Sequence, residues 1–108
     1  MAQKLNIFLN QIHVAKLTQD RNNLLSFAYT PSWLQHELAF SISLPFLLRE
    51  EPYVGKNVYA YFDNLLPDNI SVRRKIVLQT KADSAEVFDL LAQVGKDCIG
   101  ALQFISES

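Results

Sequence analysis

The spacing of apolar residues changes near the middle of this chain of 108 residues, and the change restricts the folds that the chain can adopt. Up to about residue 44, apolar and polar side chains alternate, which is the period of a half-buried β-strand. From Gly55 onward, apolar residues recur every three or four positions, which is the period of an amphipathic helix. Strands followed by helices predict an α+β fold, in which helices pack on an antiparallel sheet.

An N-terminal hairpin is the first predicted element. Residues 4–9 and 12–17 alternate and predict two strands, with Asn10-Gln11 as the turn between them. Asparagine tolerates the positive φ of a two-residue hairpin turn, whereas glutamine is a poorer second turn residue than glycine. The turn residues therefore favour a tight connection.

Two further strands and a short helix follow the hairpin. Residues 24–29 predict the third strand, and residues 40–44, which alternate up to Pro45, predict a fourth. Between them, Thr30-Pro31 has the pattern of an N-cap followed by proline in the first helical position. Residues 45–54 contain two prolines and a run of charged residues, so they predict a loop.

The second half of the chain predicts three helices. The first covers residues 55–66 and ends before Pro67, because proline cannot continue a helix. Asn69 or Ser71 can cap the second helix, which is expected to run to about Gln79.

The third helix carries the strongest pattern. Asp83 can serve as its N-cap, with Glu86 three residues later in the arrangement of a capping box, and Gly95 fits the position after its last turn. Residues 98–105 are apolar and flanked by polar residues, and they predict a last strand that returns to the sheet. The predicted buried stripe of the helix consists of Val87, Phe88, Leu91 and Val94.

These elements predict an antiparallel sheet or a partly closed barrel of about five strands, with three helices packed on one side. A hydrophobic content of 49% is sufficient for a core, and the length is that of one domain. We therefore expect a single domain over residues 1–108.

Charge and composition exclude several classes of protein. The formal net charge is -1 and the pI is near 6.1, whereas a free nucleic-acid-binding domain carries a basic face, so we expect no direct contact with nucleic acid. The N-terminus has no long apolar stretch and the sequence has no run of about 18 apolar residues, so we expect neither a signal peptide nor a membrane span. The single cysteine, Cys98, excludes an internal disulfide, and we expect a cytoplasmic protein.

No pattern in the chain predicts catalysis, a cofactor or a metal. The three glycines are isolated, so we expect no loop that cradles a phosphate. His13, His36 and Cys98 are too few and too scattered for a metal site, which needs three or four ligands. Cys98 is best explained as a small residue of the last strand, and a distant cysteine–histidine nucleophile pair is the alternative.

Two charged clusters have both a structural and a functional interpretation. Asp63 and Asp68 fit a helix end and a turn, and a pair of carboxylates for acid–base catalysis is the alternative. The basic run Arg73-Arg74-Lys75 fits a solvated helix face, and the alternative is an electrostatic contact with an acidic partner, or with DNA in a larger complex.

Three blocks of sequence resemble a known family in their order and spacing. They are Ser43-Leu44-Pro45 with Arg49-Glu50-Glu51-Pro52-Tyr53, then Phe62-Asp63-Asn64-Leu65-Leu66-Pro67-Asp68, then Gly95-Lys96-Asp97-Cys98-Ile99-Gly100-Ala101-Leu102. Together with the opening hairpin, they make the whole chain similar to the N-terminal subdomain of HipA-type kinases. The chain departs from that family at Asn10-Gln11, where an asparagine–glycine pair is typical, and the departure affects the turn geometry.

The resemblance implies a function without catalysis. HipA-type proteins are serine/threonine kinase toxins of bacterial toxin–antitoxin systems, and their kinase residues lie in the region that follows this subdomain. In a three-gene form of the system the subdomain is a separate protein, HipS, which binds and neutralises a shortened kinase, HipT. A third protein, HipB, carries a helix-turn-helix domain that binds DNA.

The resemblance therefore implies a HipS-like antitoxin rather than an enzyme. Its expected partner is a HipT-like serine/threonine kinase, and a HipB-like helix-turn-helix protein is a candidate third member of the complex. The alternative is a non-inhibitory structural or DNA-complex accessory subunit of a Hip-type kinase–repressor assembly.

We expect the partner to contact the segment where one helix ends and the next begins, here called the 61–69 corner. A helix end, a proline and a new helix start make this segment project, and the adjacent Leu65 and Leu66 cannot both face the core. Acidic groups of the corner could meet basic groups in the kinase cleft and block it, and the alternative is that the kinase lobes are held in an inactive arrangement. The expected interface residues are Tyr61, Asp63, Asn64, Leu65, Leu66, Pro67, Asp68 and Asn69.

Overall fold

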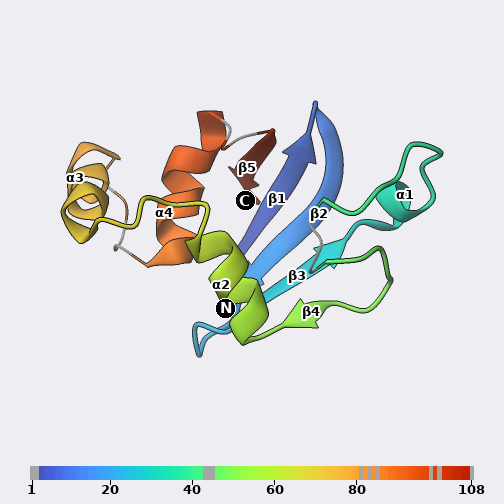
Figure 1. The fold of residues 1–108 in the computed structure, drawn as a ribbon, viewed down its shortest axis with the longest axis horizontal. Coiled ribbons are helices and arrows are strands. Elements are labelled where there is room, and N and C mark those ends of the chain that lie inside the picture. Colours follow the sequence, from blue (N-terminus) through green and yellow to red (C-terminus); the bar gives the residue numbers. More distant parts are fainter. Residues whose placement is uncertain are drawn as a thin grey trace.

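The computed structural model describes residues 3–42, 46–80, 82, 84, 86–97, 99 and 101–107. Over these residues the chain forms a five-stranded antiparallel sheet with four helices, which confirms the predicted α+β class (Figure 1). The strands are β1 (Gln3–Leu9), β2 (Ile12–Gln19), β3 (Leu25–Tyr29), β4 (Tyr53–Val54) and β5 (Leu102–Ser106). The helices are α1 (Pro31–Leu34), α2 (Lys56–Asp63), α3 (Ile70–Thr80) and α4 (Val87–Val94), and the 3-10 turn η1 (Gly95–Asp97) follows α4.

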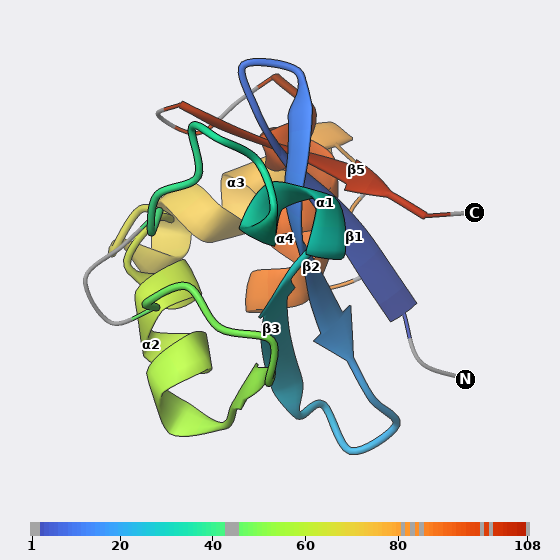
Figure 2. The ribbon, with the colours of Figure 1, turned by 90° about the vertical axis from the view of Figure 1, so that its right-hand side faces the viewer.

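The sheet is open rather than closed into a barrel. Its strand order is β4-β3-β2-β1-β5, so β4 and β5 lie at opposite edges. The helices α2 and α4 pack against the strands, whereas α3 contacts α4 and lies on the side of α4 away from the sheet (Figure 1, Figure 2). Within the described part of the chain, no helix is long and apolar enough to cross a membrane.

The predicted N-terminal hairpin is confirmed. Leu9 pairs with Ile12 across a two-residue turn in which Asn10 and Gln11 have φ values of 49° and 70°. Positive φ at both positions is the geometry of a type I′ turn, which matches the right-handed twist of the strands. Gln11 thus adopts a conformation that glycine usually takes, at a cost of about 1 kcal/mol.

The fourth strand lies elsewhere than predicted. Residues 40–42 form no strand, and the remaining predicted residues, 43–44, lie outside the described part of the chain. The fourth strand is instead β4, within the segment that predicts a loop, and its Tyr53 pairs with Phe27 of β3. The prediction of a strand over 40–44 is therefore wrong for the residues that can be checked.

Hydrogen bonds from and to side chains fix the 40–42 segment, instead of the backbone hydrogen bonds of a strand. The Trp33 indole donates to the Phe40 carbonyl at 3.2 Å, and the backbone N–H of Ile42 donates to the Tyr29 hydroxyl at 3.1 Å. Alternating polarity predicts a strand, but it does not show whether a neighbouring strand is available to pair with it.

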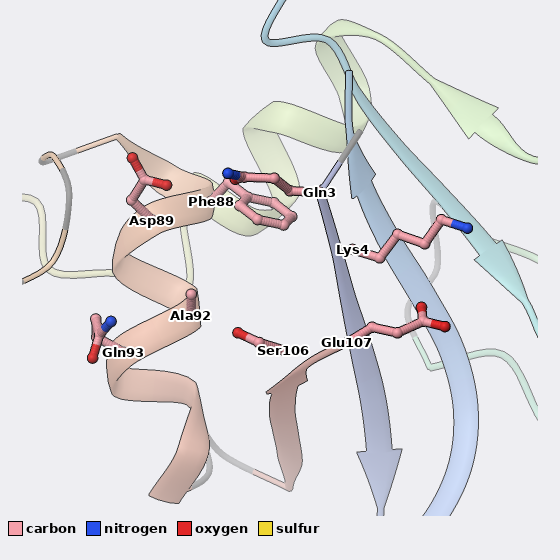
Figure 3. Close-up of a pocket in the computed structure, with 8 residues that line it drawn as sticks. All are labelled: Gln3, Lys4, Phe88, Asp89, Ala92, Gln93, Ser106 and Glu107. Carbon is pink, nitrogen blue, oxygen red and sulfur yellow. The ribbon is translucent and has the colours of Figure 1, made fainter. Parts of the chain in front are cut away.

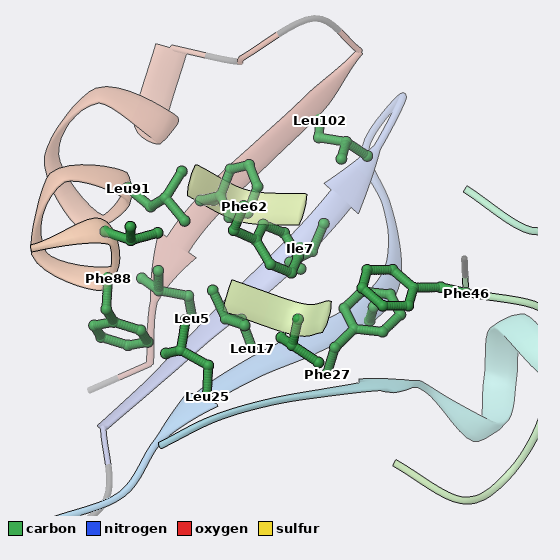
Figure 4. Packing of buried hydrophobic residues seen from close by; sticks show 14 of the residues in the cluster. Leu5, Ile7, Leu17, Leu25, Phe27, Phe46, Phe62, Phe88, Leu91 and Leu102 are labelled. Carbon is green, nitrogen blue, oxygen red and sulfur yellow. The ribbon is translucent and has the colours of Figure 1, made fainter. Parts of the chain in front are cut away.

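An aromatic cluster fills the core between the sheet and α2. Its members are Phe27, Phe46, Phe62 and Phe104, and all four are buried. Phe27 of β3 stacks on Phe46 with ring centroids 4.7 Å apart (Figure 4). Phe62 of α2 lies 5.9 Å from Phe27 and 5.9 Å from Phe104 of β5, measured between ring centroids. The Tyr29 hydroxyl donates to the Phe46 carbonyl and fixes the chain beside the cluster. Because Phe62 is buried in this cluster, the cluster positions α2.

The helix ends follow the predicted caps with small shifts. Thr30 caps α1, since its hydroxyl oxygen accepts from the Trp33 N–H at 3.1 Å. The helix α2 ends at Asp63, three residues earlier than predicted. Asn69 caps α3, because its side-chain oxygen accepts a backbone N–H of the first turn at 2.8 Å, and α3 continues to Thr80.

The capping box predicted for the last helix is wrong. The helix α4 begins at Val87, so Glu86 occupies the N-cap position, and Asp83 lies outside the described residues. Ser84 makes the connecting hydrogen bonds: its hydroxyl accepts from the Glu86 N–H at 3.0 Å and donates to the Asp89 carboxylate at 2.6 Å. The buried side chains of α4 are Val87, Phe88, Leu90 and Leu91, and Val94 is partly buried.

Gly95 ends α4 for a different reason from the predicted one. Its φ of -70° lies in the right-handed region, so Gly95 is not the left-handed residue of a C′ cap. A Cβ atom at this position would lie 2.6 Å from the Cβ of Phe104. The close approach of the helix end to β5 therefore requires glycine.

The last strand is shorter than predicted. It begins at Leu102 rather than at residue 98, and Ile99 pairs with Leu102 across a tight turn. The strand therefore does not include Cys98, which lies outside the described residues, and the burial of Cys98 stays a prediction.

We predict that Gly95→Ala lowers the free energy of unfolding by about 1–3 kcal/mol, because the added methyl group overpacks the contact with Phe104. Gln93→Ala, on the partly exposed face of the same helix, should change it by less than about 0.5 kcal/mol. Urea denaturation followed by circular dichroism measures both variants. Equal stability of Gly95→Ala and the parent chain would contradict the close approach.

His13 of β2 carries a ring nitrogen, Nε2, that is shut off from solvent without a hydrogen-bond partner in the described structure. The ring stacks on Phe8 of β1 with centroids 5.0 Å apart. Desolvation by burial, followed by the nearby Lys16 ammonium group, lowers the pKa of His13 from its ordinary 6.5. The fold therefore accommodates the neutral imidazole.

The free energy of unfolding should therefore decrease as the pH falls below 6.5, the ordinary pKa of histidine. In that range the unfolded chain binds a proton at His13 that the folded chain binds only at a lower pH, so protonation favours the unfolded state. We predict that the urea midpoint decreases less between about pH 7.5 and about pH 5.5 in His13→Gln than in the parent chain. Identical pH profiles of the two chains would exclude His13 as the source.

Candidate partner interface

The 61–69 corner is a tight reversal between α2 and α3. After α2 ends at Asp63, the N–H of Leu66 still donates to the Asp63 carbonyl at 3.1 Å. Pro67 then prevents further helix, and Asn69 starts α3 as its cap. The corner therefore has a defined backbone over its whole length.

Arg73 of α3 holds together the two arms of the corner, which are the end of α2 and the segment that leads into α3. Its guanidinium donates to the Asp63 carboxylate at 2.8 Å and to the Asp63 carbonyl at 3.2 Å, and its Nε donates to the Pro67 carbonyl at 2.6 Å. Only 14% of the Arg73 side chain is exposed, so this ion pair is shielded from water better than a surface pair. The predicted solvated face is therefore wrong for Arg73, whereas Arg74 and Lys75 are exposed.

One side of the corner is acidic. Three carboxylates and the Arg73 guanidinium share a pocket of about 330 Å³, and Asp63 is the carboxylate that pairs with Arg73. Burial, and after it the charges of Asp63 and Glu86, raises the pKa of the neighbouring Tyr59. This geometry gives Asp63 a structural partner and favours the structural interpretation of the corner over acid–base catalysis. The pocket is lined by Asp63, Asp68, Ile70, Arg73 and Glu86.

The predicted interface residues differ in their exposure. Leu66 is only 4% exposed and belongs to the core, so it supports the corner from inside. Tyr61 packs on Phe46 with ring centroids 5.0 Å apart, whereas Tyr59 of the same helix is 44% exposed. Tyr61, Asp63 and Leu65 are partly buried, and Asn64, Pro67, Asp68 and Asn69 are exposed.

An apolar groove borders the corner. Its volume is about 390 Å³, and its lining consists of aliphatic and aromatic residues. Tyr61 and Leu65 belong to both the groove and the corner, and Phe40 of the groove is 52% exposed. The lining residues are Leu9, Phe40, Ile42, Tyr61, Leu65, Ile99, Ala101 and Leu102.

The sequence reasoning missed most of this apolar groove. Its lining comes from the end of β1, the 40–42 segment, the corner and the turn before β5, which are distant in sequence. The alternation of Phe40 and Ile42 predicts a strand and gives no sign of a groove. No local pattern could have found it, because only the folded chain brings the four segments together.

The corner and the apolar groove together form a continuous candidate surface for a protein partner. Exposed apolar area with a polar rim is typical of such contacts. Among the described residues, no group of three or more histidine, cysteine or acidic side chains is placed to hold a metal ion. The molecule is thus a small α+β domain with a candidate protein-binding face.

Comparison with known families identifies the family to which this domain belongs. The family model described as the HipA N-terminal domain matches residues 5–105. The chain therefore belongs to the HipA N-terminal domain family, which confirms the resemblance carried by its three sequence blocks. The family is defined by the N-terminal domain of these proteins and not by their catalytic part.

Two relatives of the chain differ greatly in length. The chain is 34% identical over 104 residues to a protein named putative kinase Y4mE from Sinorhizobium fredii (strain NBRC 101917 / NGR234), and the match covers 95% of the chain and 24% of that protein. It is 25% identical over 101 residues to an uncharacterized protein from Haemophilus influenzae (strain ATCC 51907 / DSM 11121 / KW20 / Rd), over 94% of the chain and 90% of that protein. The chain thus spans about a quarter of the first relative and most of the second.

We predict that Arg73→Met lowers the free energy of unfolding by about 1.5 kcal/mol, because it removes charged hydrogen bonds that join the two arms of the corner. Arg74→Met, which makes the same change at an exposed neighbouring position, should stay within about 0.5 kcal/mol of the parent chain. Urea denaturation measures both changes. Equal effects of the two substitutions would show that Arg73 does not stabilise the corner.

Proposed function

We propose that this chain is an antitoxin that binds and neutralises a HipT-like serine/threonine kinase toxin in a bacterial type II toxin–antitoxin system. The observation that carries the proposal is the apolar groove joined to the 61–69 corner in a member of the HipA N-terminal domain family. A domain that neutralises a kinase without catalysing a reaction must do so by binding. It therefore needs a surface that can hold the kinase.

The apolar groove supplies the anchor in this proposal. A few buried apolar contacts carry most of the binding energy of an interface, with a loss of about 2 kcal/mol or more when one is removed. Phe40, which is exposed, and Leu65, which is partly buried, line the groove, and a side chain of the kinase would bury their remaining apolar area. Asn64, Asp68 and Asn69 are exposed and would form the polar rim.

The corner would meet the kinase in a preformed shape. Arg73 joins Asp63 to Pro67, and Asn69 fixes the start of α3, so little backbone freedom remains to be lost on binding. Asp68 is exposed at the corner, and its negative charge suits basic groups of a nucleotide-binding or substrate-binding cleft, whereas the charge of Asp63 is balanced by Arg73. We infer that the corner enters or covers the kinase cleft, and that Leu66 supports it from the core.

The remaining parts of the proposal follow from the same role. The chain would act as a single domain in the cytoplasm, without catalysis, cofactor, membrane contact or direct contact with nucleic acid. A HipB-like helix-turn-helix protein would join the complex through its own contacts.

A second candidate function rests on α3. This helix has no buried residue, and it exposes Arg74 and Lys75 beside Ile70 and Leu78, the last of which is 80% exposed. Such a face suits a non-inhibitory structural or DNA-complex accessory subunit that contacts an acidic region of a HipB-like protein. A pull-down combined with a kinase assay separates the two candidates, because an accessory subunit would bind the kinase and leave its activity unchanged.

We predict that Phe40→Asp combined with Leu65→Asp abolishes growth rescue when the chain is produced together with a HipT-like kinase, and weakens binding by about 100-fold or more. The matched control is Leu78→Asp on α3, which makes the same change at an exposed leucine outside the groove. Growth assays and isothermal titration calorimetry measure the effects, after circular dichroism confirms that the variants fold. Full neutralisation by the double variant would exclude the apolar groove as the anchor.

A further inference from the structure

One wall of the apolar groove belongs to no helix or strand. Leu9 is paired within β1 and Tyr61 lies in α2, whereas Phe40 and Ile42 stand in an irregular segment. The backbone of this wall is therefore not fixed by a strand ladder or by the hydrogen bonds of a helix. Segments of this kind open locally at a lower free energy than core strands and helices do. The shape of the groove thus depends on what holds the wall in place.

Two buried side chains hold the irregular wall. The Trp33 indole donates to the Phe40 carbonyl at 3.2 Å, and the indole and the Phe40 ring meet edge to face with centroids 5.5 Å apart. The Tyr29 hydroxyl accepts from the Ile42 N–H at 3.1 Å. Because these bonds reach residues two positions apart, they fix both ends of the wall. We call Tyr29 and Trp33 the clamp.

The Tyr29 hydroxyl also joins the groove to the aromatic cluster. It donates to the Phe46 carbonyl while it accepts from the Ile42 N–H. Burial raises the pKa of Tyr29 above its ordinary 10.0, so the hydroxyl keeps its proton at neutral pH and remains a donor. A single oxygen atom therefore links the core to the wall of the groove.

Both residues of the clamp stand on regular backbone. Tyr29 pairs with Ala15 in the sheet, and Trp33 lies in α1, which Thr30 caps. The Thr30 hydroxyl donates to the His13 carbonyl at 2.9 Å and so attaches the start of α1 to β2. The clamp can thus hold the wall in one place, although the wall has no regular structure of its own.

We propose that Tyr29 and Trp33 are positioning residues for kinase binding, which hold Phe40 and Ile42 in the shape that the kinase contacts. This inference rests on the proposed function, because it names the residues that prepare the same apolar groove. A kinase that binds only when the wall is formed loses affinity in proportion to the fraction of chains in which the wall is open. Weakening the clamp therefore lowers the affinity without removing a residue that the kinase touches.

Removal of one oxygen atom tests the clamp. We expect Tyr29→Phe to weaken the binding of a HipT-like kinase about 3- to 10-fold, the change in an equilibrium that the loss of one neutral hydrogen bond produces. Tyr53→Phe is the matched control, because its hydroxyl donates to the Leu47 carbonyl at 2.9 Å and Tyr53 does not line the groove. Isothermal titration calorimetry measures both variants after circular dichroism confirms that they fold. Equal affinities of Tyr29→Phe and the parent chain would overturn the inference.

Amide hydrogen exchange separates positioning from a general loss of stability. The Ile42 N–H loses its acceptor in Tyr29→Phe, so its exchange should become about 3- to 10-fold faster. The same amide should exchange in Tyr53→Phe as it does in the parent chain. Unchanged exchange of the Ile42 amide in Tyr29→Phe would show that Tyr29 does not hold the wall.

A double-mutant cycle tests whether the clamp acts through Phe40. Phe40→Ala removes the exposed ring and keeps the backbone carbonyl that Trp33 binds. If Trp33 positions that ring, Trp33→Phe should weaken binding about 3- to 10-fold in the parent chain and less than about 2-fold in Phe40→Ala. Equal losses in the two backgrounds would contradict a role that acts through Phe40.

A second pocket provides a control far from the clamp. It lies between α4 and the end of β5, and it shares no lining residue with the apolar groove (Figure 3). Gln93→Ala in this pocket should bind the kinase with the affinity of the parent chain. A loss as large as that of Tyr29→Phe would show that the affinity does not depend specifically on the clamp, and would overturn the inference.

The outcomes separate the two proposals. If the parent chain inhibits the kinase and Tyr29→Phe binds it equally well, the inference fails and the proposed function stands. If the parent chain neither binds nor inhibits the kinase, the proposed function fails and the inference fails with it.

Discussion

Four buried phenylalanine rings hold together the parts of the molecule that carry the candidate interface. Phe27 and Phe104 come from two strands, Phe46 from the chain before β4, and Phe62 from α2. Burying one such ring stabilises a fold by roughly 1.5–3 kcal/mol, and the stacked contact of Phe27 with Phe46 and the edge-to-face contact of Phe62 with Phe104 add to this. Because α2 is anchored through Phe62, the residues that follow it, including Leu65 and the rest of the corner, take a fixed position beside the sheet. The apolar groove depends on the same anchor, since Tyr61 of its wall packs on Phe46.

The corner is stabilised by means that are independent of the aromatic cluster. Arg73 reaches back from α3 to Asp63 and Pro67, and Asn69 caps the new helix, so each arm is fixed by a hydrogen bond to the other or to its own backbone. A surface that is ordered before binding loses less entropy when a partner docks. This gives a physical reason why a projecting helix break can serve as a contact surface. It also explains why the first residue of the basic run faces inward while the next two remain in solvent.

Membership of the HipA N-terminal domain family and the arrangement of the surface lead to one consistent proposal. The family relation supports a kinase-associated partner, and the structure supplies an apolar groove beside the corner.

Local patterns in the sequence were sufficient to predict the elements that depend only on neighbouring residues. Alternation predicted β1, β2 and β3, Asn10-Gln11 the hairpin turn, Thr30 and Asn69 the caps of α1 and α3, and Pro67 the break at the corner. The tertiary structure alone decided which strand lies beside β3, because pairing depends on the neighbour that is available and not on the alternation of residues 40–44. It also decided the role of Gly95, which is set by the distance to Phe104, and that of Arg73, which is set by carbonyls on the preceding segment. The apolar groove belongs to this second group, since its walls come from four distant segments that meet only in the folded chain.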